Sequence, residues 1–172
     1  MSVKTILTEP HKMLRQVSKS VEKVGDEERA LMDDMLETMY DAPGIGLAAI
    51  QIGIPKRIIV MDISRDENKK EPMHFVNPII KNKNEDKSKY EEGCLSVPDQ
   101  FAEIERANGC EVEYLDYNGK KRSLKADGLL ATCIQHEMDH LEGVLFIDYL
   151  SKLKKSMIIK KLSKIKSNKI IF

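Results

Sequence analysis

The sequence has 172 residues, 41% of them apolar, and its formal net charge is zero. This length and composition suit one compact domain, residues 1–172, with a sizeable core. The balanced charge gives no global reason to expect nucleic-acid binding, and three cysteines do not make a disulfide framework. Because the chain also has no apolar signal segment and no run as long as a membrane span, we expect a cytoplasmic protein without membrane attachment. We also expect a monomer.

The first part of the chain carries helical patterns. Residues 11–18 follow Pro10 and predict a short helix. A longer helix is expected after Asp26, where apolar residues recur at the spacing of one helical face, until Pro43 and Gly44 end it. The methionines of this face are expected to fill the core. The predicted stripe consists of Met32, Met35, Leu36, Met39 and Tyr40.

Residues 44–51 read Gly-Ile-Gly-Leu-Ala-Ala-Ile-Gln. Glycine allows the backbone to pass close to another group, and the two alanines are small enough for tight packing. The third glycine of a phosphate-binding loop is missing at the required spacing. Taken alone, this segment predicts a buried turn.

The middle of the chain is predicted to be mostly strands and turns. Pro78 interrupts one strand, which should therefore be bent or lie at a sheet edge. Residues 82–89 are charged and are predicted to form a solvated loop. Asn118-Gly119 indicates a hairpin turn. Strands are expected at 57–63, 74–80, 102–107, 110–117 and 120–126.

A further helix is predicted from an N-cap at Asp127 to a stop at Gly143. Together with the strands before it, this element predicts an α+β fold in which antiparallel strands pack around a central helix. Its apolar positions at helical spacing are Leu129, Leu130, Cys133, Ile134, Met138 and Leu141.

This central helix carries the sequence His-Glu-Met-Asp-His at 136–140. His136 and His140 lie one turn apart on the same face, so both imidazoles can bind one metal ion. Glu137 can transfer a proton beside that ion. The alternative is two structural histidines on an ordinary helix.

A metal site needs a third ligand, and the downstream sequence does not provide one. Phe146 stands where an extended motif has a third histidine, and no glutamate follows Glu142. Cys133 lies seven residues before the second histidine, roughly 10 Å along a helix axis, and Cys110 begins a strand-like run. Cys94 lies in an irregular or edge segment bounded by glycine and proline, and it is the third ligand by elimination.

Three blocks of the chain resemble the peptide deformylases of bacteria and organelles. They are residues 44–51, residues 92–96 (Glu-Gly-Cys-Leu-Ser) and residues 135–140 (Gln-His-Glu-Met-Asp-His). The resemblance extends over nearly the whole chain. It implies a single catalytic domain and a hydrolase that removes the formyl group from N-formylmethionine of nascent polypeptides, a co-translational step of protein biosynthesis.

The site residues imply a mechanism for that reaction. A water bound to the metal would attack the formyl carbon, with Glu137 as general base and then general acid. The resemblance implies that the oxyanion is stabilised by the side-chain amide of Gln51 and the backbone N–H of Leu95. It also implies Fe(II) as the metal in cells, with zinc, nickel or cobalt able to occupy the same site.

The resemblance further implies a pocket for the methionine side chain. Phe101 stands where some relatives carry a basic residue near the bound peptide, so no peptide preference beyond the first residue is implied. The implied pocket residues are Ile45, Gly46, Glu92, Leu129 and Cys133.

Two other functional classes are compatible with parts of this pattern. One is a metallopeptidase of the zincin type, which the missing downstream ligand disfavours and a Cys94 remote from the metal would favour. The other is a catalytically inactive binding protein of the same fold, which the complete set of candidate catalytic residues disfavours.

Residues 150–172 predict a basic, amphipathic C-terminal helix. From 151 to 172 there are eight lysines and no acidic residue, and such a local positive field suits a polyanion. The resemblance implies binding to the ribosome through this helix. The alternative is a helix docked on the domain with a solvated lysine face. The predicted apolar stripe is Leu150, Leu153, Met157, Ile158, Leu162 and Ile165.

Overall fold

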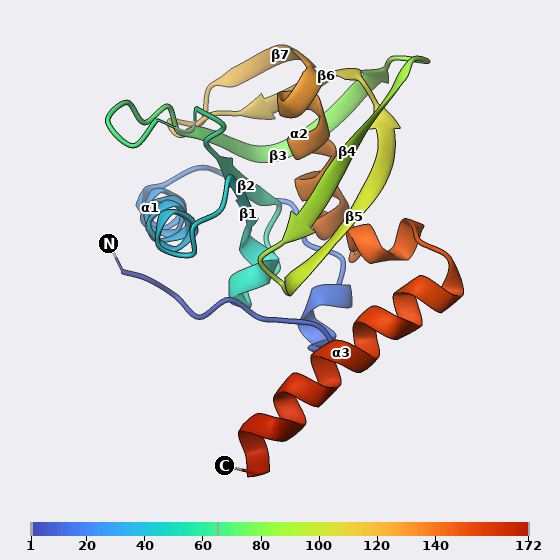
Figure 1. Cartoon of the computed structure of the whole chain (residues 1–172). Helices are drawn as coiled ribbons and strands as arrows, with labels where there is room; N and C mark the ends of the chain where they lie inside the picture. The colour runs from blue at the N-terminus through green and yellow to red at the C-terminus, as the bar shows by residue number, and fades with distance from the viewer. Residues whose placement is uncertain (1, 65, 172) are drawn as a thin grey trace.

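The structure is a computed structural model that describes residues 2–64 and 66–171, with side chains described as far as Lys164. It has three α-helices, seven strands and three short 3-10 helices (Figure 1). The helices are α1 (Asp26–Asp41), α2 (Gly128–Leu141), α3 (Lys152–Ile171), η1 (Lys12–Arg15), η2 (Ala49–Ile52) and η3 (Phe146–Tyr149). The strands are β1 (Gly46–Ala48), β2 (Ile58–Met61), β3 (Met73–Lys83), β4 (Lys87–Cys94), β5 (Val97–Ala107), β6 (Gly109–Leu115) and β7 (Lys121–Asp127).

The strands form two antiparallel sheets. Five strands pair in the order β1-β2-β3-β6-β7, and β4 and β5 form a separate two-stranded sheet. Helix α2 contacts strands of both sheets and lies between them, while α1 packs on β1 and β2 (Figure 1). The predicted α+β class, with antiparallel strands around a central helix, is confirmed.

The boundaries of α2 follow the sequence signals. Asp127 is the N-cap residue, although its side chain makes no capping hydrogen bond. The chain leaves the helix at Gly143, whose φ of 72° suits glycine and whose N–H donates to the carbonyl of His140. A Cβ at Gly143 would lie 2.4 Å from the Arg15 carbonyl oxygen, so only glycine allows η1 to pack this closely on the helix end.

The apolar stripe of α1 forms a second part of the core. Met32, Met35 and Met39 are fully buried against β1 and β2, and Leu36 and Tyr40 are partly buried beside them. The prediction that these methionines fill the core is confirmed. The first predicted helix, at 11–18, is shorter than expected and consists only of the four residues of η1.

The strand that contains Pro78 was predicted to be bent or to lie at a sheet edge, and the first of these alternatives holds. β3 is a central strand rather than an edge strand, because it pairs with both β2 and β6. Pro78 is tolerated there since its missing N–H falls within a register shift between Val76 and Ile79, where Asn77 has a φ of 50°. The bend expected from this proline is therefore present.

The prediction of a solvated loop at 82–89 is wrong. β3 continues to Lys83 and β4 begins at Lys87, so only three residues form the connection. Charge alone gave no reason to expect strands. The long strands are compatible with charge because most of these side chains are exposed while the backbone pairs with β6 and β5.

Helix α3 packs on the domain through a narrower apolar face than predicted. Ile158 and Leu162 are buried in a cluster that includes residues of β5 and η3. Leu153 and Met157, which the sequence predicts on the same face, are 71% and 51% exposed and do not belong to this cluster. The side chain of Ile165 lies outside the described residues. No helix in the described part of the chain has the length and apolar character that crossing a membrane requires.

Candidate metal centre and active-site cavity

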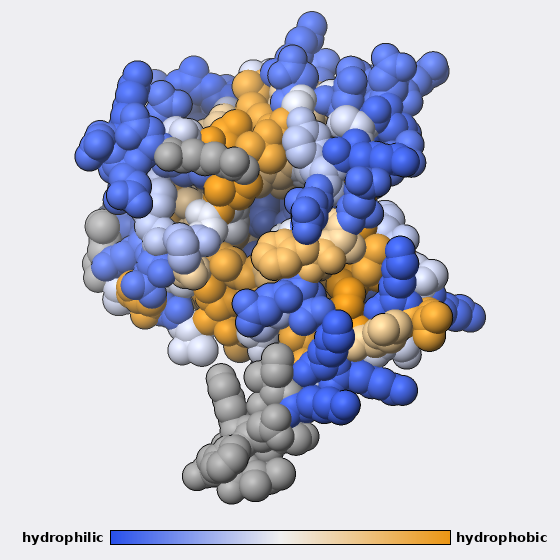
Figure 2. Space-filling model, viewed as in Figure 1, coloured by the Kyte–Doolittle hydropathy of each residue, from blue (hydrophilic) through white to orange (hydrophobic). Residues whose placement is uncertain are grey.

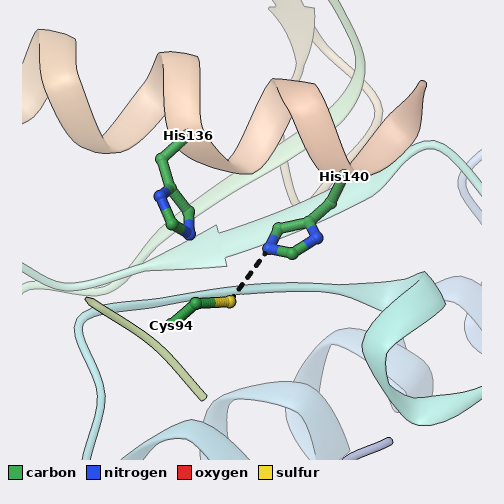
Figure 3. Close-up of side chains that lie close together, drawn as sticks. All are labelled: Cys94, His136 and His140. Carbon is green, nitrogen blue, oxygen red and sulfur yellow. Dashed lines mark hydrogen bonds between the residues drawn. The ribbon is translucent and has the colours of Figure 1, made fainter. Parts of the chain in front are cut away.

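The two histidines of α2 project from one face of the helix toward the same point. His136 and His140 lie one turn apart, with ring centroids 5.3 Å from each other, and His140 is almost completely buried (Figure 3). Burial and the neighbouring His136 lower the pKa of His140 well below its usual value. A neutral imidazole is the form that binds a metal ion.

Cys94 approaches the histidines from the opposite side. It is the last residue of β4, beyond a register shift after Gly93 that reorients the chain end. Its Sγ lies 3.4 Å from Nε2 of His140, and the candidate ligand atoms of Cys94, His136 and His140 all lie within 4.8 Å of one another (Figure 3). One thiolate and two imidazoles fit zinc or Fe(II), and three protein ligands leave a coordination position open.

The other two cysteines are separate from this group. Cys110 is buried in β6, and Cys133 lies on α2 at the wall of the neighbouring cavity. Burial raises the pKa of Cys133 well above its usual value, so this thiol stays protonated and is a poor metal ligand. The position of Cys94 beside the histidines also fails to support the zincin alternative, which required a remote Cys94.

The ion pair between Glu92 and Arg106 orients the ring of His136 through its Nδ1. Nδ1 of His136 lies 2.8 Å from a carboxylate oxygen of Glu92, which leaves Nε2 facing Cys94. Arg106 donates two hydrogen bonds to the same carboxylate, at 2.7 and 3.0 Å. Burial alone would raise the pKa of Glu92, but the hydrogen bonds from His136 and Arg106 lower it below its usual value. Glu92 is therefore ionised and suited to fix the orientation of the imidazole.

Glu137 lies beside this group and is almost completely buried. It is 3% exposed, and its Oε2 has no hydrogen-bond partner among the described residues. Burial raises the pKa of Glu137 to about 7, the range in which a carboxyl group can both take up and release a proton near neutral pH. Gly46 makes room for it, because a Cβ at Gly46 would lie 3.0 Å from the Glu137 carboxyl carbon.

Gln51 is held with its amide nitrogen facing the site. It lies in η2 and is buried, and its Oε1 accepts a hydrogen bond from the backbone N–H of Ala48 at 2.9 Å. Its Nε2 donates to Oγ of Ser96 at 3.0 Å and lies 3.7 Å from Sγ of Cys94. The sequence alone predicted a buried turn for residues 44–51; the segment is buried from Leu47 onward, but it forms the short strand β1 and the 3-10 helix η2, and it carries an amide that faces the candidate metal group.

A cavity of about 690 Å³ opens in front of these residues. Apolar side chains gather around the hollowed centre of this face, and hydrophilic side chains surround them (Figure 2). Of the predicted site residues, His140 alone is not part of the cavity lining. The predicted residues that line it are Ile45, Gly46, Gln51, Glu92, Cys94, Leu95, Leu129, Cys133, His136 and Glu137.

Several residues of the site were not predicted from the sequence. Thr132 and Tyr90 are among the further side chains that line the cavity, and Arg106 was not recognised as a partner of Glu92. A signal for Arg106 was present, because it follows Ile104 at strand spacing and so points to the buried face of β5. Phe101, which stands where a basic residue was expected in some relatives, lies at the cavity rim and is 65% exposed.

Comparison with known proteins identifies close relatives. A family model described as polypeptide deformylase matches residues 3–156. A peptide deformylase of Pelagibacter ubique (strain HTCC1062) is 87% identical over 171 residues, covering 99% of both chains.

Solved structures agree with the sequence relatives. The crystal structure of peptide deformylase from Ehrlichia chaffeensis is 44% identical, covers 96% of this chain and 97% of its own, and superposes with a TM-score of 0.91. A second structure of that name, in complex with actinonin, is 48% identical, covers 95% and 98% of the two chains, and has a TM-score of 0.90. These relatives carry the name of an enzyme, which favours the enzyme over the inactive binding protein.

Proposed function

The chain belongs to the peptide deformylase family, and we propose that it removes the formyl group from N-formylmethionine at the start of nascent polypeptides. The observation that carries this proposal is the grouping of Cys94, His136 and His140 beside the buried Glu137 at the wall of a 690 Å³ cavity. In this proposal the whole chain, residues 1–172, acts as one catalytic domain in the cytoplasm.

Cys94, His136 and His140 are proposed to hold one metal ion. When bound, the ion would lower the pKa of a water molecule and polarise the formyl carbonyl. We propose Fe(II) in cells, with zinc, nickel or cobalt able to replace it, since one thiolate and two imidazoles accept all four. Glu92 supports this arrangement by keeping Nδ1 of His136 engaged, so that Nε2 is the nitrogen available to the metal.

Glu137 is proposed to move the proton. Its carboxylate accepts a proton from the attacking water, and its carboxylic acid then delivers a proton to the departing amine. The raised pKa of about 7 makes both forms accessible at neutral pH. The unpartnered Oε2 leaves one carboxylate oxygen free for this exchange.

Gln51 and Leu95 are proposed to stabilise the oxyanion that forms on the former formyl oxygen. Ser96 and the backbone of Ala48 fix the Gln51 amide, so this donor requires little reorganisation during the reaction. The backbone N–H of Leu95, next to Cys94, supplies the second donor. Loss of one such donor commonly costs about 3 kcal/mol of transition-state stabilisation.

The cavity is proposed to bind the methionine side chain of the substrate. Its mostly apolar lining suits the thioether of a methionine side chain. The proposed pocket residues are Ile45, Gly46, Glu92, Leu129 and Cys133. Glu92 does not place a free charge in this pocket, because its carboxylate is paired with Arg106 and His136.

Turnover of a formyl-methionyl peptide tests the proposed activity. The metal-loaded enzyme should release formate from this peptide, and the acetyl-methionyl peptide of the same sequence should react far more slowly. Absence of formate release from enzyme that demonstrably holds one metal ion per chain would reject the proposed reaction.

The basic C-terminal helix is proposed to bind the ribosome. Among the described side chains of α3, Lys155 pairs with Asp148 at 2.7 Å, whereas the other lysines are exposed and make no ion pair within the domain. These exposed lysines are Lys152, Lys154, Lys160, Lys161 and Lys164. The buried contacts at Ile158 and Leu162 attach the helix to the domain without using them. Phosphate contacts made by such lysines should weaken as salt rises. Deletion of the residues after Ser163 removes three lysines and retains both buried contacts.

Co-sedimentation with ribosomes tests this second proposal. The truncated enzyme should bind less tightly at low salt while hydrolysing a small formyl-peptide as before. The matched control replaces Lys120, Lys121 and Lys125, three exposed lysines near β7, with glutamine. Binding that is independent of salt, or equally reduced in both variants, would assign α3 a structural role.

A further inference from the structure

The ion pair behind His136 continues outward to a third partner. Arg106 uses Nε and Nη2 for the Glu92 carboxylate, and its Nη1 donates to Oδ2 of Asp139 at 2.9 Å. Asp139 lies on α2 directly before His140. Burial would lower the pKa of Arg106, but the two carboxylates raise it, so the guanidinium remains charged between them.

Tyr149 closes this network at the protein surface. Its hydroxyl donates to Oδ2 of Asp139 at 2.8 Å, the same oxygen that accepts from Arg106. Its ring also covers the guanidinium, with Cζ of Arg106 5.1 Å from the ring centroid. Tyr149 therefore contacts Arg106 directly through its ring and indirectly through Asp139.

We propose that Tyr149 is a positioning residue for the metal centre. It holds Arg106 from the outside, Arg106 holds Glu92, and Glu92 fixes the ring of His136. This inference rests on the metal-binding part of the proposed function and is independent of the substrate. It assigns Tyr149 a role that neither the cavity lining nor the candidate ligand set includes.

The burial of the inner residues explains why an outer contact can matter. Arg106 and Glu92 are each 6% exposed, so their hydrogen bonds operate in a region of low dielectric constant and geometric change is costly. If Asp139 loses the Tyr149 hydroxyl, its carboxylate can rotate and carry Arg106 with it. Partners that orient a metal ligand commonly change metal affinity by about 10- to 100-fold. Tyr149 is further removed and half exposed, so we expect a weakening of roughly 3- to 10-fold.

The test compares two substitutions at Tyr149 with a matched control. Tyr149→Phe removes the hydroxyl and keeps the ring over Arg106, whereas Tyr149→Leu removes both. The control is Tyr40→Phe, which also removes a short tyrosine–carboxylate hydrogen bond, 2.6 Å to Asp62, but in a different part of the fold. Cobalt(II) is the probe, because its affinity can be measured by chelator competition and its visible absorption reports ligand geometry.

Both Tyr149 variants should bind cobalt more weakly than the control and show a shifted absorption band, with the leucine variant affected more. In an Asp139→Ala background, Tyr149→Phe should cause no further loss, because its hydroxyl acts through that carboxylate. Cobalt affinity and spectrum equal to those of Tyr40→Phe would overturn the inference. A loss of cobalt affinity that is fully explained by a lower unfolding temperature of the variant would also overturn it. A parent enzyme that binds no cobalt would reject the metal site itself, and a parent that binds cobalt without deformylating a peptide would reject only the proposed reaction.

Discussion

The substitution Glu137→Gln should separate catalysis from stability. Glu137 is buried without a hydrogen-bond partner for Oε2, so its ionised form is unfavourable in the folded protein. Glutamine has nearly the same shape and carries no charge. The variant should therefore keep the fold and the metal ligands but lose most of its turnover, because the proposed proton carrier is absent.

The pKa gives the expected size of the stability effect. Burial raises the pKa of Glu137 from 4.5 to about 7, so between these pH values the folded protein retains a proton that the unfolded chain releases. The free energy of unfolding thus falls as pH rises through this window, and the cost remains above pH 7. At about 1.4 kcal/mol per pH unit the full cost is on the order of 3 kcal/mol. Metal-free Glu137→Gln should be more stable than the parent by up to this amount at pH 8.

Urea unfolding of the metal-free proteins at pH 8 and pH 4.5 measures this effect. The advantage of the variant should be largest at pH 8 and should nearly disappear at pH 4.5. Glu142→Gln is the control, because Glu142 is a surface carboxylate 2.7 Å from Arg57 and its replacement should change stability by only about 0.5 kcal/mol. An unchanged stability at pH 8, together with kcat within about threefold of the parent, would refute this account of Glu137.

Three further predictions concern the ligands, the metal and acid stability. Cys94→Ala should lose the metal while Cys110→Ala and Cys133→Ala retain it; full metal content in the first variant with loss in another would contradict the ligand assignment. The Fe(II) enzyme should lose activity in air while the nickel enzyme retains it, because the iron and its thiolate ligand are sensitive to oxidation; equal half-lives of the two forms would argue against iron as the native metal. Burial would raise the pKa of Asp148, but hydrogen bonds, the largest from Arg15, lower it below 3.8. The ionised Asp148 therefore stabilises the fold above pH 3.8, and this stabilisation is lost as the pH falls through the lowered pKa of the folded protein. Denaturant unfolding should show that Asp148→Asn destabilises the protein more at pH 7 than at pH 2. Equal destabilisation at both pH values would mean that the ion pairs of Asp148 are not the cause.

Local sequence patterns predicted the features that depend on local geometry. The spacing of Met32, Met35 and Met39 identified the buried face of α1, and the Asn118-Gly119 pair identified the turn between β6 and β7. Caps and apolar spacing identified the central helix, and the i, i+4 spacing placed His136 and His140 on one face of it, since that relation depends only on helical periodicity. The resemblance to a known family then supplied Gln51 and the pocket residues, which no periodic pattern could have revealed.

Features set by distant pairing could not be predicted in this way. The central position of β3 depends on partners on both sides, and Pro78 alone could not distinguish a bent strand from an edge strand. Leu153 and Met157 have the composition of a buried face, but the direction from which η3 and β5 approach α3 leaves them exposed. The contact of Arg106 with Glu92 likewise joins residues whose pairing depends on the register of β4 and β5.

The separation of the candidate ligands along the chain has a consequence for folding. Cys94 ends a strand of the two-stranded sheet, and His140 lies on α2, 46 residues later. An ion held by both would cross-link the β4–β5 hairpin to the central helix and bind only when the two are docked. Each tenfold increase of free metal above its dissociation constant would then add about 1.4 kcal/mol to the docked form. The supply of metal would therefore set the fraction of molecules in which the hairpin is docked on the helix, and with it the fraction in which a protease could reach the chain between them.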